Sequence, residues 1–299
     1  RITVLHQGKV IADGAPAEVA ANPVVVEAYL GKSRSEKVPT LPVAVARVSR
    51  SAAAVAPLLK LEDLRAGYDG SCVLDGLSMI VNPGEVVALL GRNGVGKTTT
   101  QRAIMGVIPA QSGRIYLDGQ DITGKKPFQI NRLGISIVPE GRRLFPNLTV
   151  RDNIRIAARR GGATADEIFD LFPKLRARYR ARAENLSGGE RQMLAIARAL
   201  MAPSKLILLD EPFEGLAPAV VAEVMDAVLR LRTRSSMMIV EHKAELVLPI
   251  ADHAYVLVNG KIAYGGAASE LAADLPLQER LLGVAHAKTT AEYGELISV

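Results

Sequence analysis

The chain of 299 residues has 48% hydrophobic and 23% charged residues, a composition that supports a full hydrophobic core and excludes disorder as the main state. Its apolar runs, such as 86–90 and 206–209, have strand length and fall short of the roughly 20 residues that cross a bilayer. Any membrane role therefore requires a partner. Cys72 is the only cysteine and there are four histidines, which excludes an intrachain disulfide and disfavours a zinc site.

The formal net charge of +6 is unevenly distributed. Residues 125–182 hold fourteen Lys and Arg residues against five Asp and Glu residues, and segment 32–57 is also basic. Such stretches are either solvated faces or surfaces for an acidic partner, for nucleic acid or for a loop of a membrane protein.

Residues 2–31 are repeated, without a gap, at residues 254–283. Twelve positions are identical in the two copies, including the paired sequences Val4-Leu5 and Leu30-Gly31, which is far above chance at average composition. Both copies predict a β-hairpin, turning at Gly8 or Gly260, followed by a helix. We interpret residues 1–31 as a remnant of the C-terminal end of an upstream domain of the same kind, and residues 32–57 as a linker.

Residues 58–285 have the pattern of one α/β domain, followed by a C-terminal tail at 286–299. Apolar runs at 58–64, 73–79, 85–90, 134–138, 205–209 and 236–240 alternate with helical stretches near 97–107, 149–160, 187–201 and 218–233. This alternation predicts a mostly parallel core sheet covered by helices. The basic stretch interrupts it and predicts an inserted helical subdomain at about 140–200.

The most specific motif is a glycine-rich loop that follows the apolar run VVALL and precedes a helical pattern. Its residues are Gly91, Arg92, Asn93, Gly94, Val95, Gly96, Lys97 and Thr98, with Thr99 next. In such a loop the backbone N–H groups point at phosphate oxygens and the helix adds its positive N-terminal end. Lys97 is expected to contact the β- and γ-phosphates and Thr98 to bind Mg²⁺.

Two adjacent carboxylates, Asp210 and Glu211, end the apolar run LILL. Because neighbouring side chains on a strand point to opposite faces, the two can take different roles. We expect Asp210 to hold Mg²⁺ and Glu211 to act as general base on the attacking water.

A third motif, at 186–190, opens a helix with Ser187 as N-cap and Glu190 three residues later. This is a capping box. Capping leaves unexplained the pair Gly188-Gly189, whose backbone N–H groups would be open to an anion at the helix N-terminus.

The motifs GRNGVGKT, LSGGE and LILLDE, with His242 after the run MMIVE, resemble the ATP-binding cassette (ABC) ATPases over about residues 58–283. The stretches VPEGRRLFPNLTV and EPFEGLAP are similar to the ATP-binding subunits of branched-chain amino acid importers, and residues 1–31 resemble the end of the companion ATPase in those systems. The resemblance implies a P-loop NTPase core with an antiparallel β subdomain and a helical subdomain, which binds and hydrolyses ATP with Mg²⁺.

The same resemblance assigns residue roles. It implies that Tyr68 stacks on adenine, that His242 contacts the γ-phosphate as part of the catalytic set with Lys97 and Glu211, and that Ser187, Gly188 and Gly189 bind ATP held by an opposing subunit. Two positions depart from the family: Glu140 stands where the family has a glutamine near Mg²⁺, and Ala217 where it usually has an aspartate. Both variants resemble the branched-chain subgroup.

The partners implied are a second ABC ATPase subunit, permease subunits bound through the helical subdomain and, only indirectly, a periplasmic binding protein. No direct binding to nucleic acid is expected, and the implied location is peripheral, at the cytoplasmic face of the inner membrane. Two alternatives stay open: a soluble ABC ATPase that acts on ribosomes or nucleic acid, and a truncated fusion that binds ATP without productive coupling.

Overall fold

The computed structural model describes residues 1–6, 9–15, 18–19, 22, 56–68 and 70–283. The chain divides into two compact units, Arg1–Ser51 and Ala52–Val299. Most of the predicted linker, from 32 to 55, lies outside the described residues, as does the whole predicted tail at 286–299. Among the described residues, no helix combines the length and apolar character needed to cross a membrane.

The larger unit is built on a six-stranded sheet with the order β12-β11-β5-β10-β9-β8. Neighbouring strands are parallel except for the β11–β12 hairpin at one edge. Strands β5, β9 and β10 are buried at every position, as expected for parallel strands covered on both faces. The strands are β5 (Val86–Leu90), β8 (Ile135–Val138), β9 (Leu206–Asp210), β10 (Ser236–Glu241), β11 (His253–Val258) and β12 (Lys261–Ala267).

A second sheet of the same unit is antiparallel, with the order β4-β3-β6-β7. Buried and exposed residues alternate along much of β3 and β4, so this sheet packs one face on the core and leaves the other to solvent. Its strands are β3 (Leu59–Ala66), β4 (Leu74–Val81), β6 (Ala110–Leu117) and β7 (Gln120–Asp121). The sequence predicted β3 and β4 but missed β6, whose first half, AQSG, lacks an apolar run.

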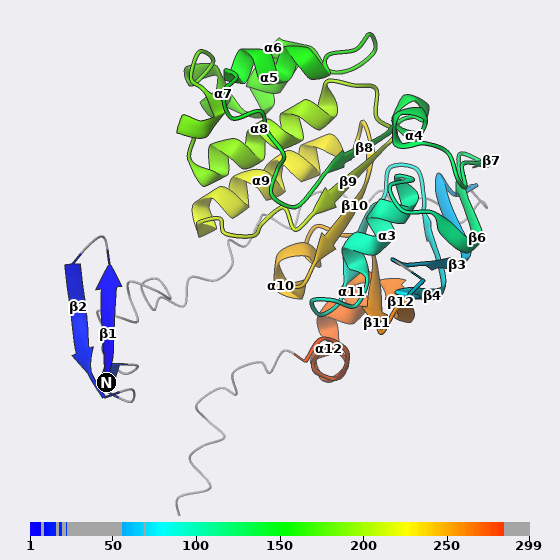
Figure 1. The fold of residues 1–299 in the computed structure, drawn as a ribbon, viewed down its shortest axis with the longest axis horizontal. Helices are drawn as coiled ribbons and strands as arrows, with labels where there is room; N and C mark the ends of the chain where they lie inside the picture. Colours follow the sequence, from blue (N-terminus) through cyan, green and yellow to red (C-terminus); the bar gives the residue numbers. More distant parts are fainter. Residues whose placement is uncertain (7–8, 16–17, 20–21, 23–55, 69, 284–299) are drawn as a thin grey trace, which may run out of the picture. The chain divides into compact units, whose positions relative to one another are not determined.

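Helix α3 (Lys97–Ile104) follows the glycine-rich loop and contacts both sheets through β3 and β9. A group of helices between β8 and β9 forms the predicted helical subdomain, which lies at the opposite end of the unit from the antiparallel sheet (Figure 1). This group comprises α5 (Val150–Ala157), α6 (Ala165–Leu171), α7 (Pro173–Ala177), the 3₁₀ turn η1 (Ala183–Asn185) and α8 (Gly188–Leu200).

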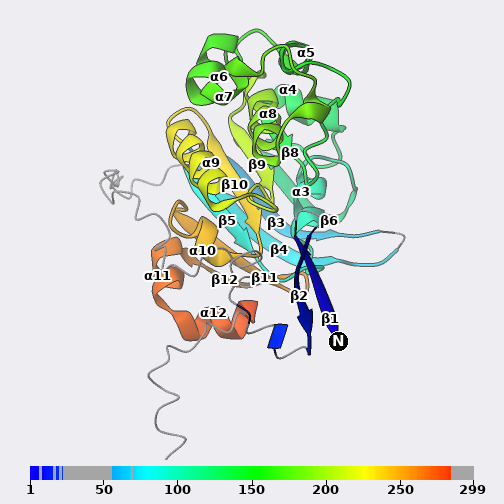
Figure 2. The ribbon, with the colours of Figure 1, turned by 90° about the vertical axis from the view of Figure 1, so that its left-hand side faces the viewer.

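The remaining helices flank the core strands. They are α4 (Pro127–Leu133), α9 (Pro218–Leu231), α10 (Ala244–Val247), α11 (Ala268–Ala273) and α12 (Leu275–Leu282). Figure 2 shows α11 and α12 at the end of the unit away from α5, α6 and α7. The second repeat was predicted to end in one helix, and this is wrong: Pro276 opens α12 and the Asp274 carboxylate caps it by accepting the Leu277 N–H at 2.9 Å, so the chain forms two short helices.

The smaller unit contains the hairpin of β1 (Ile2–His6) and β2 (Lys9–Gly14). Its register matches that of β11 and β12 position for position: Val4 pairs with Ala12 as Val256 pairs with Tyr264. Both hairpins also have an irregularity at the equivalent place, after Val4 and after Val256. The turn at Gly8 and most of the helix predicted after it lie outside the described residues, although residues 18–19 are helical. The repeated sequence therefore folds into the same hairpin twice.

Candidate active site

The glycine-rich loop connects β5 to α3 at the carboxyl edge of the parallel sheet. Gly96 is the N-cap residue of α3 with φ of 113°, a left-handed conformation that glycine adopts without strain. It offers no side chain to cap the helix, so the first N–H groups of α3 are available to an anion. Asn93 and Gly94 are exposed, Val95 is half-buried, and Thr99 is buried on the inner side of α3.

Lys97 is buried, with 5% of its surface exposed. Its Nζ donates to the carbonyl oxygens of Gly91 at 2.8 Å and Arg92 at 3.0 Å, and lies 4.0 Å from Glu211 Oε1. Burial lowers the pKa of Lys97, while the nearby carboxylates, Glu211 first, oppose that shift. The ammonium group therefore lies inside the loop, at the N-terminus of α3.

Asp210 and Thr98 face each other across the loop, with the Thr98 hydroxyl donating to Asp210 Oδ1 at 3.3 Å. Burial raises the pKa of Asp210 to about 6; the Thr98 hydrogen bond opposes the rise, and the charges of Glu211 and Glu140 add to it. The backbone N–H of Glu140 also donates to Asp210. The structure thus brings the Thr98 hydroxyl and the Asp210 carboxylate into contact, while Glu140 reaches Asp210 through its backbone N–H.

A hydroxyl and one or two carboxylates suit Mg²⁺, which keeps waters and takes substrate phosphates for its remaining positions. Within the described ranges, no three His, Cys, Asp or Glu side chains are grouped so as to hold a metal ion without such help. The oxygen atoms of Thr98 and Asp210 therefore fit a nucleotide-bound Mg²⁺ and not a site made wholly of protein ligands.

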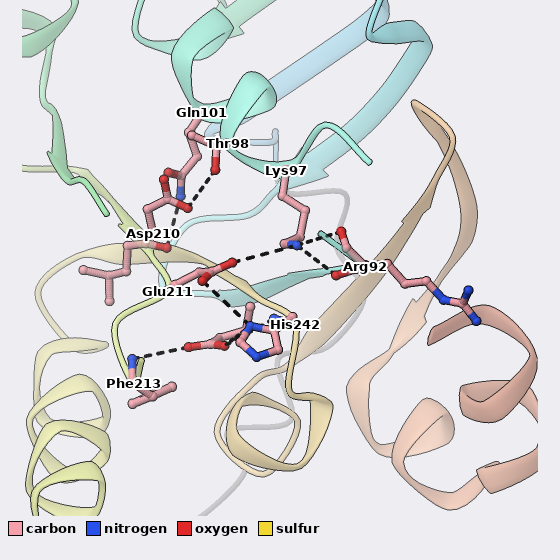
Figure 3. Close-up of polar contacts among 11 residues, drawn as sticks. Arg92, Lys97, Thr98, Gln101, Asp210, Glu211, Phe213 and His242 are labelled. Carbon is pink, nitrogen blue, oxygen red and sulfur yellow. Dashed lines mark hydrogen bonds and ion pairs between the residues drawn. The ribbon is translucent and has the colours of Figure 1, made fainter. Parts of the chain in front are cut away.

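Glu211 does not continue β9, which ends at Asp210, so the strand alternation expected from the sequence does not apply to it. It has φ of 46°, and its N–H donates to the Val240 carbonyl at 3.0 Å. This left-handed turn, and not the alternation of a strand, directs the Glu211 carboxylate toward Lys97 and His242 (Figure 3). A left-handed conformation at a non-glycine residue costs about 1–3 kcal/mol and is found at functional sites.

Glu241, the last residue of β10, is a site residue that the sequence analysis missed. It is 1% exposed and accepts the N–H groups of Phe213 at 3.3 Å and His242 at 3.2 Å. Burial raises the pKa of Glu241 to about 7. His242 Nδ1 is 3.8 Å from both Glu211 Oε2 and Glu241 Oε2 and has no hydrogen-bond partner in the part of the chain that the structure describes. A carboxylate ending the otherwise apolar strand SMMIVE was the available signal.

Two predicted contacts lie at the rim of the site. Tyr68 follows β3, is 36% exposed and accepts a hydrogen bond from Arg102 at 3.0 Å through its hydroxyl group. The Arg92 side chain points away from Lys97 toward α12 (Figure 3), where its Nε donates to the Leu282 carbonyl at 3.0 Å. Arg92 thus contributes its backbone, and not its charge, to the loop.

The capping box at Ser187 forms as predicted: Ser187 Oγ accepts the Glu190 N–H at 3.2 Å and Glu190 Oε2 accepts the Ser187 N–H at 2.8 Å. The two glycines differ. A Cβ at Gly189 would lie 2.5 Å from Val220 Cγ1 of α9, so close helix packing explains this glycine, while a Cβ at Gly188 would meet nothing within 4 Å. Ala217, the N-cap of α9, provides no side-chain cap.

Taken together, the parallel sheet, the glycine-rich loop, the buried lysine and the carboxylates after β9 define a P-loop nucleoside triphosphatase. Residues 74–214 match the family model described as ABC transporter, and residues 9–34 match one described as branched-chain amino acid ATP-binding cassette transporter. The chain belongs to the ABC transporter ATP-binding proteins, which are ATPases, and is homologous to the ATPases of branched-chain amino acid importers.

The similar proteins include transport ATPases of different systems. The chain is 38% identical to the high-affinity branched-chain amino acid transport ATP-binding protein BraG of Pseudomonas aeruginosa over 76% of this chain and all of BraG. It is 35% identical to the probable branched-chain amino acid transport protein LivF of Archaeoglobus fulgidus, over 76% of this chain and 99% of LivF. It is also 33% identical to the lipopolysaccharide export protein LptB of Escherichia coli, over 75% of this chain and 97% of LptB.

Solved structures agree with this assignment. A nucleotide-free ATP-binding cassette from an ABC transporter is 29% identical, with a TM-score of 0.67 over 77% of this chain and all of that chain. An ADP-bound cassette is also 29% identical, with a TM-score of 0.66 over the same shares. The predicted fold, an α/β P-loop core with antiparallel and helical subdomains, is confirmed.

Proposed function

We propose that the loop at 91–98 binds the triphosphate of ATP, and that Glu211 activates the water that attacks the γ-phosphate. The observation that carries this proposal is the buried Lys97 ammonium at the N-terminus of α3, 4.0 Å from the Glu211 carboxylate. Such a pair suits phosphoryl transfer. The cation can stabilise negative charge on the phosphates, and the carboxylate can accept a proton from the attacking water.

Around this pair the remaining predicted residues have compatible positions. Thr98, Asp210 and Glu140 would hold Mg²⁺, which neutralises phosphate charge. His242 would contact the γ-phosphate through its ring, which Glu211 and Glu241 flank. Tyr68, whose side chain is partly exposed, would stack on the adenine.

Ser187, Gly188 and Gly189 are proposed to complete the site of a second ATPase subunit. The first turn of α8 offers backbone N–H groups at its N-terminus, and Gly188 leaves open space above it. A related solved structure of 27% identity, covering 76% of this chain, is described as part of an ABC transporter complex. Two subunits would close on ATP and reopen after hydrolysis.

The helical subdomain is proposed to bind permease subunits. A groove of about 420 Å³ runs between β8 and the helices α5 and α8. Phe145 and Ile156, which are 44% and 60% exposed, line it together with Arg143 and Arg159. Exposed apolar side chains beside cationic ones suit a short amphipathic segment from a cytoplasmic loop of a membrane protein.

Arg142 links this surface to the turn that follows Glu211. Its guanidinium donates to Gln192 Oε1 of α8 at 2.8 Å and to the Glu214 carbonyl, in the turn after Glu211, at 3.4 Å. Movement of the helical subdomain would therefore reach the segment that positions the general base.

The transported solute is proposed to be a branched-chain or other hydrophobic amino acid, by analogy with BraG and LivF. The protein would then act at the cytoplasmic face of the inner membrane, and a periplasmic binding protein would be linked to it only through the permease. The match of residues 9–34 and the identical hairpin registers support the proposal that residues 1–31 are the end of a companion ATPase domain, joined by a linker at 32–57 to the ATPase domain at 58–285.

The Glu211→Gln variant tests the proposed function. Removing the base should lower ATP hydrolysis by at least about 100-fold, while Mg-ATP binding, measured by equilibrium dialysis, should persist. Glu214→Gln, an exposed carboxylate of the same turn, is the matched control and should hydrolyse ATP normally. Undiminished hydrolysis in Glu211→Gln would remove Glu211 from its role, and steeply salt-dependent RNA binding by the wild type would favour the ribosome-associated alternative.

A further inference from the structure

We propose that Arg92 is a positioning residue. It holds the glycine-rich loop at the C-terminal end of α12, so that the position of α12 affects the affinity of the loop for ATP. This inference rests on the proposed function of the loop, and it concerns a contact between residues 190 positions apart in the sequence.

The Arg92 side chain binds the C-terminal end of a helix. Leu282 is the last residue of α12, and its carbonyl oxygen accepts the Arg92 Nε–H at 3.0 Å. The last carbonyl groups of a helix have no partner within the helix and carry partial negative charge. A guanidinium group is a well-matched donor at this place.

The glycine that follows makes room for the guanidinium. Gly283 is the C-cap of α12, with φ of 70°. A Cβ built on Gly283 would overlap Nη2 and Cζ of Arg92 and would lie 2.8 Å from its Nε. Any other residue at 283 must therefore expel the Arg92 side chain, so the arginine and the glycine form a matched pair.

Arg92 also contacts Lys97, through its backbone. The main-chain carbonyl of Arg92 accepts the Lys97 Nζ–H at 3.0 Å, beside the Gly91 carbonyl at 2.8 Å. One residue thus holds α12 with its side chain and Lys97 with its backbone, as Figure 3 shows. Because the guanidinium points away from Lys97, Arg92 acts on ATP through the position of the loop and not through its own charge.

The first copy of the repeat has the same residues at the positions equivalent to Leu282 and Gly283. Leu30 and Gly31 occupy the positions that correspond to Leu282 and Gly283. The companion domain proposed to precede the linker would therefore end in the same acceptor and the same glycine.

The experiment is a double-mutant cycle on the full chain, with the KM and kcat of ATP hydrolysis and the Kd for ATP as readouts. Arg92→Ala and Gly283→Ala should each weaken ATP binding and raise KM by about threefold to tenfold, the scale of one partly buried charge-assisted hydrogen bond. Most of the loss should fall on KM and not on kcat. The double variant should bind ATP no more weakly than the weaker-binding single variant, because both substitutions break the same contact.

Gly119→Ala is the matched control. Gly119 has φ of 75°, close to that of Gly283, but a Cβ there would meet nothing within 4 Å. It therefore reproduces the backbone strain without the clash, and its KM should equal that of the wild type.

Three outcomes would overturn the positioning role: Gly283→Ala with the KM of Gly119→Ala, effects of Arg92→Ala and Gly283→Ala that multiply, or a lowered Tm without a change in KM or Kd. The third describes a purely structural contact. Each leaves the proposed function intact as long as Glu211→Gln abolishes hydrolysis, so the two proposals fail separately.

Discussion

Replacing Glu241 with glutamine should stabilise the protein more at pH 8 than at pH 5. The Glu241 carboxyl group is 1% exposed and ends a buried strand. It accepts the N–H groups of Phe213 and His242, which partly offset the cost of burying its charge. Glutamine has the same shape and keeps one carbonyl acceptor, but it never ionises.

The size of this pH dependence follows from the pKa of Glu241. Burial raises the pKa of Glu241 from 4.5 to about 7, so the folded protein keeps a proton that the unfolded chain has released. Stability therefore falls as the pH rises from about 4.5 to about 7 and then stays level. The full loss is about 3 kcal/mol, of which roughly 2–3 kcal/mol falls between pH 5 and pH 8.

Urea unfolding of the wild type and of Glu241→Gln at pH 5, 6, 7 and 8 measures this loss. The difference in unfolding free energy, variant minus wild type, should grow by roughly 2–3 kcal/mol across the series. Glu245→Gln, at an exposed position of α10, controls for the change in net charge and should give a flat difference. A flat difference for Glu241→Gln as well would refute the reasoning, because it would mean that burial does not perturb this carboxyl group.

Three further predictions test other parts of the site. Lys97→Ala should weaken ATP binding by about 10–100-fold in equilibrium dialysis, since it removes a buried charge-assisted contact; unchanged affinity would exclude Lys97 from phosphate binding. Asp210→Asn should raise the Mg²⁺ concentration needed for half-maximal hydrolysis by about tenfold or more, and an unaltered Mg²⁺ titration would exclude a metal role. Gly189→Ala should destabilise the protein by about 1–3 kcal/mol in urea unfolding because its Cβ would lie 2.5 Å from Val220 Cγ1, whereas Gly188→Ala should not; equal effects would contradict the packing explanation.

The sequence predicted those parts of the fold in which local pattern and tertiary environment agree. The runs VVALL and LILLD are continuous apolar segments, and they became fully buried parallel strands. Strand β6 was missed because its half-exposed first part, AQSG, has no apolar pattern of its own, and it forms where β3 supplies a pairing edge.

The site shows the same division. Lys97, Thr98 and Asp210 come together because the loop and two parallel strands end at one edge of the sheet. The direction of Glu211 depends on a left-handed turn, which its position after a strand does not reveal. The direction of Arg92 depends on α12, far along the chain. The carboxylate at the end of an apolar strand was the signal for Glu241, but its burial is set by tertiary packing, in which β10 pairs with β5 and Glu241 lies beside Leu90.

The most direct test of the account is a crystal structure of the Glu211→Gln variant with Mg²⁺ and ATP. We expect the three phosphates to lie against the N–H groups of residues 91–98 with Lys97 beside them, and Ser187 of a second molecule to face the γ-phosphate. Phosphates located anywhere else on the molecule would contradict the account.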